Sequence, residues 1–234
     1  MFSKIRYGVE TVIIGILYIT VLPFLHILYP RKVIWEDKKA TKAVLKKPCV
    51  IYSNHTGYAD GLFVYGMLTK YKPYTFVGKD WYENRKLNRL LIHLRYIPID
   101  RQQMDTSWLI KGKKVVDEGN SIYFFPEGHT SKDGLLLPFQ PGFLMLAKQC
   151  NVPLVPISID RKIEAWKKVR IIIGKPQYID FNEEGRPSVV LKKYAAICQE
   201  TVVDLKDRFG DPKCVTDDVL KYREKKVSEQ SGQN

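Results

Sequence analysis

His55 and Asp60 lie five residues apart in YSNHTGYADGLF (residues 52–63), a short polar stretch between two apolar runs. On one continuous helix, residues five apart point about 140° away from each other, so the chain must turn if these side chains are to meet. Gly57 allows such a turn if a strand ends at Asn54 and Asp60 begins the next helix. A carboxylate bonded to one imidazole nitrogen fixes the tautomer and makes the other nitrogen more basic, as a general base for a hydroxyl group requires. The spacing alone also fits a pair that only caps a helix or satisfies loop amides.

A second polar loop, PEGHTS at residues 126–131, directly follows the apolar run IYFF. Gly128 permits a close backbone approach to a ligand, and Glu127, Thr130 and Ser131 can bind hydroxyl groups or orient a basic partner. The simpler interpretation is a turn made of turn-forming residues. Glu127 argues against a simple turn, because a carboxylate at the end of a buried strand needs a partner.

Two cations follow other strand-like runs, Arg101 after RYIPID and Lys79 after YTFVG. Arginine binds phosphate through a planar fork of donors, so Arg101 could hold a phosphorylated substrate. Either cation could instead form an ordinary surface ion pair. Sites in open α/β sheets collect at the carboxyl ends of strands. We therefore expect the loops NHTGYAD, PEGHTS and IDRQ, the last of which carries Arg101, to share one rim of the sheet.

Other chemistries have weaker support in the sequence. It contains no GxSxG, GxxxxGK[ST] or GxGxxG pattern. His55, Asp60, Glu127 and His129 are suitable residue types for a metal site, but their spacing is no recognised ligand pattern. The four cysteines have no CxxC spacing and are expected to be reduced intracellular thiols. We therefore expect no resident metal or cofactor.

The chain has 234 residues, of which 45% are hydrophobic, enough for one substantial domain. Its formal charge of +13 is spread along the sequence. Such a surface favours anionic partners: phospholipid membranes, phosphorylated substrates, nucleic acids or acidic carrier proteins. Charge alone does not choose among them.

Short β-branched or aromatic runs alternate with helical patterns after a basic linker expected at residues 31–47. This alternation predicts an α/β domain with a largely parallel central sheet flanked by helices, over residues 36–212. The expected strands are residues 49–54, 74–78, 95–99, 121–125, 153–159 and 169–174, and the expected helices are residues 58–70, 80–93, 106–118, 142–150 and 187–209. Residues 213–234 form a charged tail whose end is expected to be disordered.

Residues 11–29 contain no Asp, Glu, Lys or Arg and would extend about 28 Å as a helix, close to the thickness of a bilayer core. The run lacks the small-residue end of a cleavable signal peptide. Pro23 and His26 interrupt it, and basic residues flank both ends, so it fits a spanning helix, a hairpin or an in-plane helix. We expect residues 1–35 to be a membrane-associating helical segment. A buried core helix is the alternative.

Four of these segments together resemble the glycerolipid (lysophospholipid) acyltransferase family. NHTGYAD resembles its NHx4D block, YIPIDR its arginine-bearing block, FPEGHTS its FPEGxxS block and VPISI (residues 155–159) its VPxxI block. The four blocks occur in the family's order over residues 50–160. The resemblance is strongest to the 1-acylglycerol-3-phosphate acyltransferases.

The resemblance implies direct transfer of an acyl group from a thioester to lysophosphatidic acid, with no covalent acyl-enzyme. His55 would take the proton of the acceptor hydroxyl, and Asp60 would orient His55. The residues implied in binding the glycerol phosphate and the neighbouring acyl region are Arg101, Glu127, Gly128, Ser131 and Pro156. The expected partners are a phospholipid membrane, a lysophospholipid, and acyl-CoA or acyl carrier protein, with no nucleic acid. The enzyme would be membrane-associated, with its active site on the cytoplasmic side.

One departure from the family pattern loosens the acceptor assignment. Related enzymes often read FKxG after the PEGHTS loop, whereas this chain reads FQPG at residues 139–142. Lys79 or Lys132 could replace the missing lysine, or the acceptor could be another lysophospholipid or glycerol 3-phosphate. A metal-dependent lipid hydrolase and a non-catalytic lipid carrier are the alternatives from other functional classes.

Overall fold

The structure is a computed structural model of the chain. It describes residues 24, 27–57, 60, 68, 71, 73–79, 83, 91, 95–100, 106–130, 136–213 and 221–224.

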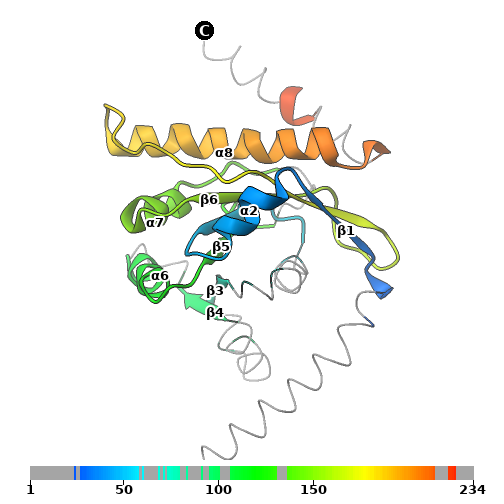
Figure 1. Cartoon of the computed structure of the whole chain (residues 1–234), viewed down its shortest axis with the longest axis horizontal. Coiled ribbons are helices and arrows are strands. Elements are labelled where there is room, and N and C mark those ends of the chain that lie inside the picture. Colours follow the sequence, from blue (N-terminus) through cyan, green and yellow to red (C-terminus); the bar gives the residue numbers. More distant parts are fainter. Residues whose placement is uncertain are drawn as a thin grey trace, which may run out of the picture.

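Within these residues, seven strands form one sheet in the order β1-β7-β6-β2-β5-β3-β4 (Figure 1). The strands are β1 (Arg31–Trp35), β2 (Val50–Ser53), β3 (Tyr74–Gly78), β4 (Tyr96–Ile99), β5 (Ile122–Phe124), β6 (Leu154–Ile159) and β7 (Val169–Ile173). Every neighbouring pair is parallel except β6 and β7. All residues of β2 and β6 are buried, as expected for central parallel strands covered on both faces.

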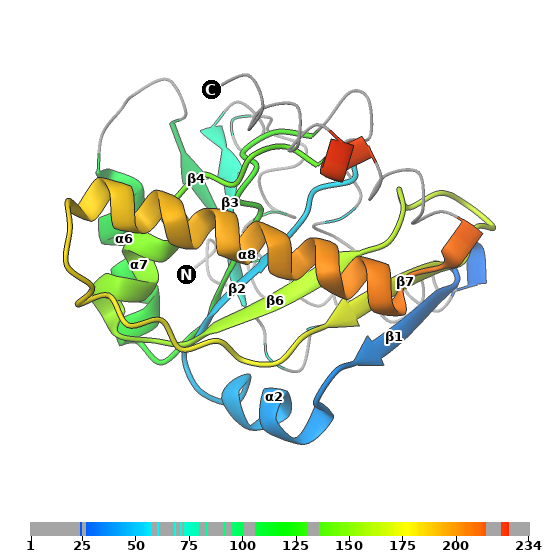
Figure 2. The same cartoon turned by 90° about the horizontal axis from the view of Figure 1, so that it is seen from above.

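In the part of the chain that the structure describes, helices pack on both faces of the sheet. Helices α6 (Ser107–Asp117), α7 (Gly142–Cys150) and α8 (Pro187–Phe209) pack on one face, and α8 runs across the strands in both views (Figures 1 and 2). The chain at the end of α2 (Lys38–Val44) packs on the other face through Leu45. Successive residues of β2 alternate between the two cores, with Ile51 on the side of Leu45 and Val50 and Tyr52 on the side of α7 and α8.

The direction of the strands gives the sheet two different edges. Strands β6, β2, β5, β3 and β4 all end at the same edge, which we call the carboxyl edge. Strand β7 is antiparallel to β6, and β1 is parallel to β7, so these two strands begin at the carboxyl edge. The chain before β1 therefore approaches the sheet at the edge where β2 and β5 end.

The end of β7 packs very closely against its neighbours. A β-carbon at Gly174 would lie 2.8 Å from both Leu205 Cδ1 on α8 and Pro156 Cγ on β6. The Gly174 carbonyl also accepts a hydrogen bond from the Thr41 hydroxyl of α2 at 3.0 Å. The absence of a side chain at Gly174 thus allows β7, β6 and α8 to pack closely at this point, away from the carboxyl edge.

The predicted α/β class with a mostly parallel sheet is confirmed, and so are the six predicted strands, to within two residues at their ends. The predicted helices 106–118, 142–150 and 187–209 correspond to α6, α7 and α8. The prediction that residues 31–47 form a linker is wrong. Its first five residues form β1, which pairs with β7, and α2 follows with its first turn capped by Asp37, whose carboxylate accepts from Ala40 N at 2.9 Å.

Other predictions fall largely or wholly outside the described residues: the membrane-associating part of the N-terminal segment, most of helices 58–70 and 80–93, and the end of the tail. The domain boundaries stay predictions. In the part of the chain that the structure describes, no helix combines the length and the apolar character needed to cross a bilayer.

Candidate active site

The NHTGYAD loop begins at a fixed position on the carboxyl edge. Asn54 follows β2, and its side-chain amide donates to Ile159 O at 2.9 Å while its Oδ1 accepts from Ile159 N at 2.8 Å. This two-way pairing joins the ends of β2 and β6. His55, the next residue, therefore starts from a rigid support.

Asp60 is the centre around which the loop folds. Its carboxylate is fully buried and accepts hydrogen bonds from Gly57 N at 2.8 Å, from the Thr56 hydroxyl at 2.8 Å and from Thr56 N. The His55 ring contacts the same carboxylate, with Nδ1 2.9 Å from Oδ2. The predicted turn and the predicted contact between His55 and Asp60 are confirmed.

The imidazole of His55 is held on a second side by an aromatic ring. It stacks on Phe125, which follows β5, with centroids 4.1 Å apart and an interplanar angle of 22°. The His55 side chain is 19% exposed. Because Nδ1 faces Asp60, Nε2 is the nitrogen that can exchange a proton with a substrate.

Glu127 connects the two polar loops. One carboxylate oxygen accepts from the His55 backbone N–H at 2.6 Å, and the other accepts from Leu137 N at 2.8 Å. The side chain is buried, and this burial raises the pKa of Glu127 to about 7, although both amide hydrogen bonds act in the opposite direction. The expectation that Glu127 needs a partner is confirmed. Its partners are main-chain amides, which makes it a support for His55 in this structure.

Gly128 completes a tight turn after β5. Its N–H donates to Phe125 O at 3.0 Å, and its φ of +74° lies in the left-handed region that glycine adopts without strain. Gln140 N donates to Pro126 O at 2.9 Å, so the FQPG segment runs beside this turn. The residue that stands where related enzymes often have lysine thus lies next to the PEGHTS loop.

Of the predicted phosphate-binding cations, the structure describes Lys79 but not Arg101 or Lys132. Lys79 follows β3 at the carboxyl edge and lies 3.6 Å from Glu83, with both side chains more than half exposed. Such an exposed pair contributes little to stability and leaves the ammonium accessible. Arg101, Ser131 and Lys132 lie outside the described residues.

Lys162 is a candidate that the sequence analysis missed. It is exposed, three residues after the end of β6, and a β-carbon at Gly57 would lie 3.6 Å from its Cγ and Cε atoms. Its stem therefore packs on the NHTGYAD loop, two residues from His55. The only signal in the sequence is its position three residues after the VPISI block.

The residues of the alternative metal site do not form one. Among the described residues, no group of three or more His, Cys, Asp or Glu side chains is placed to hold a metal ion. Glu127 and Asp60 instead direct their oxygens at backbone amides, a hydroxyl and the His55 ring.

Two buried cysteines are poor nucleophiles. Burial raises the pKa of Cys49 to about 11 and that of Cys198 to about 12, so few of these thiols are in the reactive thiolate form.

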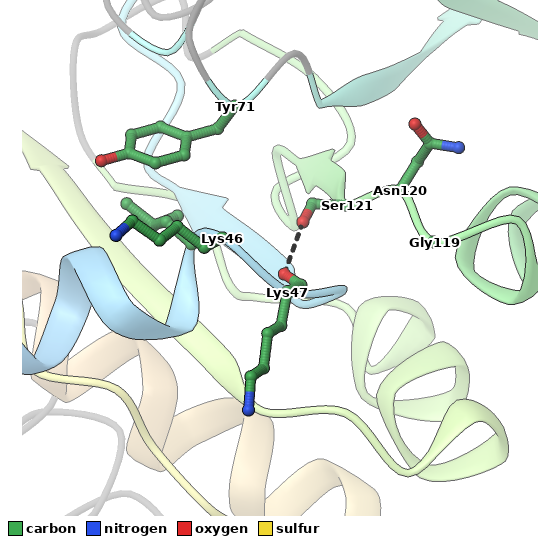
Figure 3. Close-up of a pocket in the computed structure, with 7 residues that line it drawn as sticks. Lys46, Lys47, Tyr71, Gly119, Asn120 and Ser121 are labelled. Atoms are coloured by element: carbon green, nitrogen blue, oxygen red, sulfur yellow. Dashed lines mark hydrogen bonds between the residues drawn. The ribbon is translucent and has the colours of Figure 1, made fainter.

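A separate pocket of about 230 Å³ opens at the opposite edge of the sheet. Figure 3 shows its lining, which includes Lys46 and Lys47 before β2 and Asn120 and Ser121 before β5. Within this lining, the Ser121 hydroxyl donates to Lys47 O at 3.3 Å. This pocket lies at the amino ends of the strands and is not part of the His55 site.

Comparison with known proteins identifies relatives of this chain. Residues 32–160 match the Acyltransferase family. The chloroplastic 1-acyl-sn-glycerol-3-phosphate acyltransferase BAT2 of Brassica napus is 31% identical over 144 residues, which are 56% of this chain and 41% of that protein. The 1-acyl-sn-glycerol-3-phosphate acyltransferase of Limnanthes douglasii is 35% identical over 131 residues, 53% of this chain and 44% of that protein. The matched region thus spans less than half the length of these two relatives.

A solved structure shares the fold. The crystal structure of the 1-acyl-sn-glycerophosphate (LPA) acyltransferase PlsC from Thermotoga maritima superposes with a TM-score of 0.53 at 21% identity, covering 77% of this chain and 75% of PlsC. The family match covers the NHTGYAD, FPEGHTS and VPISI segments, and the structure places Asn54, His55 and Glu127 from the first two beside one another and beside the end of β6. The chain therefore belongs to the acyltransferase family whose members include the 1-acyl-sn-glycerol-3-phosphate acyltransferases.

Proposed function

We propose that this protein transfers a fatty acyl group from an acyl thioester to the free hydroxyl of lysophosphatidic acid, forming phosphatidic acid. The observation that carries the proposal is the 2.9 Å contact between His55 Nδ1 and a fully buried Asp60 carboxylate. The donor is an acyl thioester of coenzyme A or of acyl carrier protein. The site faces the cytoplasmic side of a membrane.

In this mechanism Nε2 of His55 accepts the proton of the acceptor hydroxyl while its oxygen attacks the thioester carbonyl. The tetrahedral intermediate then collapses, the carbon–sulfur bond breaks, and the imidazolium returns the proton to the departing thiolate. Asp60 stabilises the imidazolium and holds the tautomer in which Nδ1 carries a hydrogen. General base catalysis of this kind contributes about 10²–10⁴-fold to the rate.

Binding of the acceptor phosphate is assigned to cations at the carboxyl edge. Arg101 is the primary candidate, because its guanidinium can form a bidentate contact with phosphate. Lys79, Lys132 and Lys162 are further candidates, and Gly128 and Ser131 would contribute the adjoining wall. Glu127 acts through His55 and the loop backbone, because both its oxygens already accept amide hydrogens.

A second acceptor class has one specific observation in its favour. Gln140, beside the PEGHTS turn, is uncharged where related enzymes often carry lysine. A site with less positive charge would discriminate less strongly against lysophospholipids with a larger head group, such as lysophosphatidylethanolamine.

The test is an acyl transfer assay of the full chain in detergent or lipid, with radiolabelled acyl-CoA and acyl carrier protein as alternative donors. Lysophosphatidic acid, glycerol 3-phosphate and lysophosphatidylethanolamine are offered in parallel. We expect the highest kcat/KM with lysophosphatidic acid. Absence of transfer to all three acceptors with both donors would refute the proposal, and release of free fatty acid that a chelator abolishes would support a metal-dependent hydrolase.

A further inference from the structure

Residues 161–168, in the loop between β6 and β7, lie at the same edge of the sheet as His55. Lys162 packs on Gly57 at one end of this loop. At its other end, Trp166 N donates to Leu28 O at 2.7 Å, and Val169 N donates to Pro30 O at 3.0 Å. The loop and the chain entering β1 lie side by side in both overall views (Figures 1 and 2). The antiparallel direction of β7 causes this arrangement, since it returns the chain to the carboxyl edge.

Trp166 is held in an unusual position on this loop. Its side chain is 71% exposed, and its φ of +61° lies in the left-handed region, which is unfavourable for a bulky side chain. The hydrogen bond to Leu28 and the buried side chain of Ile163 hold the loop in place. The exposed ring adds no buried contact to the core, which points to a role of Trp166 at the surface of the domain.

Exposed apolar and basic side chains occur on the two segments that meet at this hydrogen bond. Ile27, next to Leu28, is 66% exposed, and Phe24, earlier in the same segment, is 62% exposed. Residues 161–168 carry four basic side chains and one acidic side chain. Arg161 pairs with Asp211 at 2.5 Å and Lys167 with Glu164 at 2.6 Å, while Lys162 and Lys168 are also exposed. Asp160, at the start of the loop, lies 4.0 Å from Arg161, and the loop stays net positive with Asp160, Glu164 and Asp211 all counted.

We propose that loop 161–168, together with Phe24 and Ile27, docks on the surface of a bilayer that contains anionic phospholipid. Tryptophan prefers the interfacial zone of a membrane, where its ring meets the acyl chains and its N–H meets the head groups. Lysines at the same level are attracted to anionic head groups. This docking turns the carboxyl edge toward the membrane, so that a lipid acceptor reaches His55 directly from the bilayer. The inference rests on the proposed function for the identity of that acceptor.

The experiment measures binding of the full chain to vesicles by co-sedimentation. The vesicles are phosphatidylcholine alone or phosphatidylcholine with phosphatidylglycerol, and the variants are Trp166→Ala and the double variant Lys167→Gln/Lys168→Gln. We expect Trp166→Ala to bind both kinds of vesicle about tenfold more weakly. We expect the double variant to bind the anionic vesicles about 20-fold more weakly and the neutral vesicles unchanged.

Matched controls exist at the opposite edge of the sheet. Tyr178 is 77% exposed beside Gln177, which pairs with Leu154 at the start of β6. Tyr178→Ala is therefore an aromatic control, and Lys46→Gln/Lys47→Gln, in the pocket of Figure 3, is a charge control. Both controls should bind vesicles as the unmodified chain does.

A second measurement isolates Trp166 from the contribution of the N-terminal apolar run. Lipids brominated on their acyl chains quench a tryptophan that reaches them, and Trp166→Ala should remove most of this quenching. Unchanged quenching and unchanged vesicle binding in Trp166→Ala, or equal losses in the control variants, would overturn the proposal.

Activity without a membrane separates this inference from the proposed function. With short-chain acyl-CoA and short-chain lysophosphatidic acid below their micelle concentrations, Trp166→Ala and Lys167→Gln/Lys168→Gln should keep the rate of the unmodified chain. If the unmodified chain itself transfers no acyl group, the proposed function fails, while the vesicle measurements still decide whether this loop docks on a membrane. A loss of this soluble activity in Trp166→Ala would contradict a role limited to docking.

Discussion

The backbone N–H of His55 donates a 2.6 Å hydrogen bond to the buried carboxylate of Glu127, 72 residues later in the chain. Through this bond the loop after β5 supports the loop after β2. The second oxygen of Glu127 extends the connection to Leu137. The His55 ring is thus positioned from two sides, by Asp60 through Nδ1 and by Glu127 through the main chain.

The burial of Glu127 predicts a particular pH dependence of stability. Its pKa rises from 4.5 to about 7 on folding, so the folded chain binds the proton more tightly than the unfolded chain. Protonated Glu127 therefore stabilises the fold. This stabilisation is fully present below pH 4.5, and about 3 kcal/mol of it is lost as the pH rises to about 7. In Glu127→Gln, the free energy of unfolding should no longer decrease with pH between pH 4.5 and 7, so the slope seen in the unmodified chain should be absent.

The cost of the lost hydrogen bond is measured where Glu127 is protonated. Glutamine can accept from only one of the two amides through its oxygen, so Glu127→Gln should be destabilised by about 1–3 kcal/mol below pH 4.5, and this deficit should shrink or reverse as the pH rises to 7. Glu118→Gln, at the exposed end of α6, is the control and should keep the slope of the unmodified chain. Equal slopes in Glu127→Gln and the unmodified chain would contradict the assignment.

Asp60→Asn should impair the chemical step more than substrate binding. The amide cannot stabilise the imidazolium and can present its NH₂ group to His55, which favours the wrong tautomer. We expect kcat to fall by about 10²–10⁴-fold with KM nearly unchanged. Thr56→Val is the control, because it removes one hydrogen bond to Asp60 and leaves the contact with His55 in place. A similar loss of kcat in both variants would show that loop folding, not the charge of Asp60, limits the rate.

Lys162 and Lys79 can be compared as phosphate-binding candidates. Lys162 packs on the loop that carries His55, whereas Lys79 faces Glu83. We expect Lys162→Ala to raise KM for lysophosphatidic acid about tenfold with kcat unchanged, and Lys79→Ala to raise it less. Steady-state kinetics at saturating acyl donor measures both. A larger effect of Lys79→Ala would reverse the order of the two candidates.

Gly174→Ala should destabilise the fold. The added methyl group would lie 2.8 Å from Leu205 and Pro156, and overpacking of this kind costs about 1–3 kcal/mol. Gly142→Ala is the matched control, because the nearest atom to its methyl group would be 3.4 Å away on Trp108. Denaturant unfolding should show a lower midpoint for Gly174→Ala and little change for Gly142→Ala.

Much of the sheet can be predicted from the sequence, because its buried parallel strands are continuous β-branched or aromatic runs. Strand β1 was missed because RKVIW follows an apolar run and begins with two basic residues, and its place beside β7 depends on contacts more than 130 residues away. The direction of β7 is likewise not visible in its own residues. It decides that the chain before β1 arrives at the edge where His55 lies.

The local half of the candidate site was predictable, and the long-range half was not. His55 and Asp60 are close in sequence, and one turn brings them together. The partners of Glu127 and the packing of Lys162 on Gly57 depend on neighbouring strands that end at one edge. Sequence spacing holds no information on those distances.

The central claim is that the His55 imidazole is the general base of acyl transfer. The most direct measurement compares the rate of radiolabelled acyl transfer to lysophosphatidic acid by the unmodified chain and by His55→Ala, with vesicle binding and thermal unfolding measured on the same samples. We expect kcat to fall by about 10²–10⁴-fold in His55→Ala, with vesicle binding unchanged and a cooperative unfolding transition retained at the assay temperature. A His55→Ala variant that transfers acyl groups at the rate of the unmodified chain would contradict this mechanism.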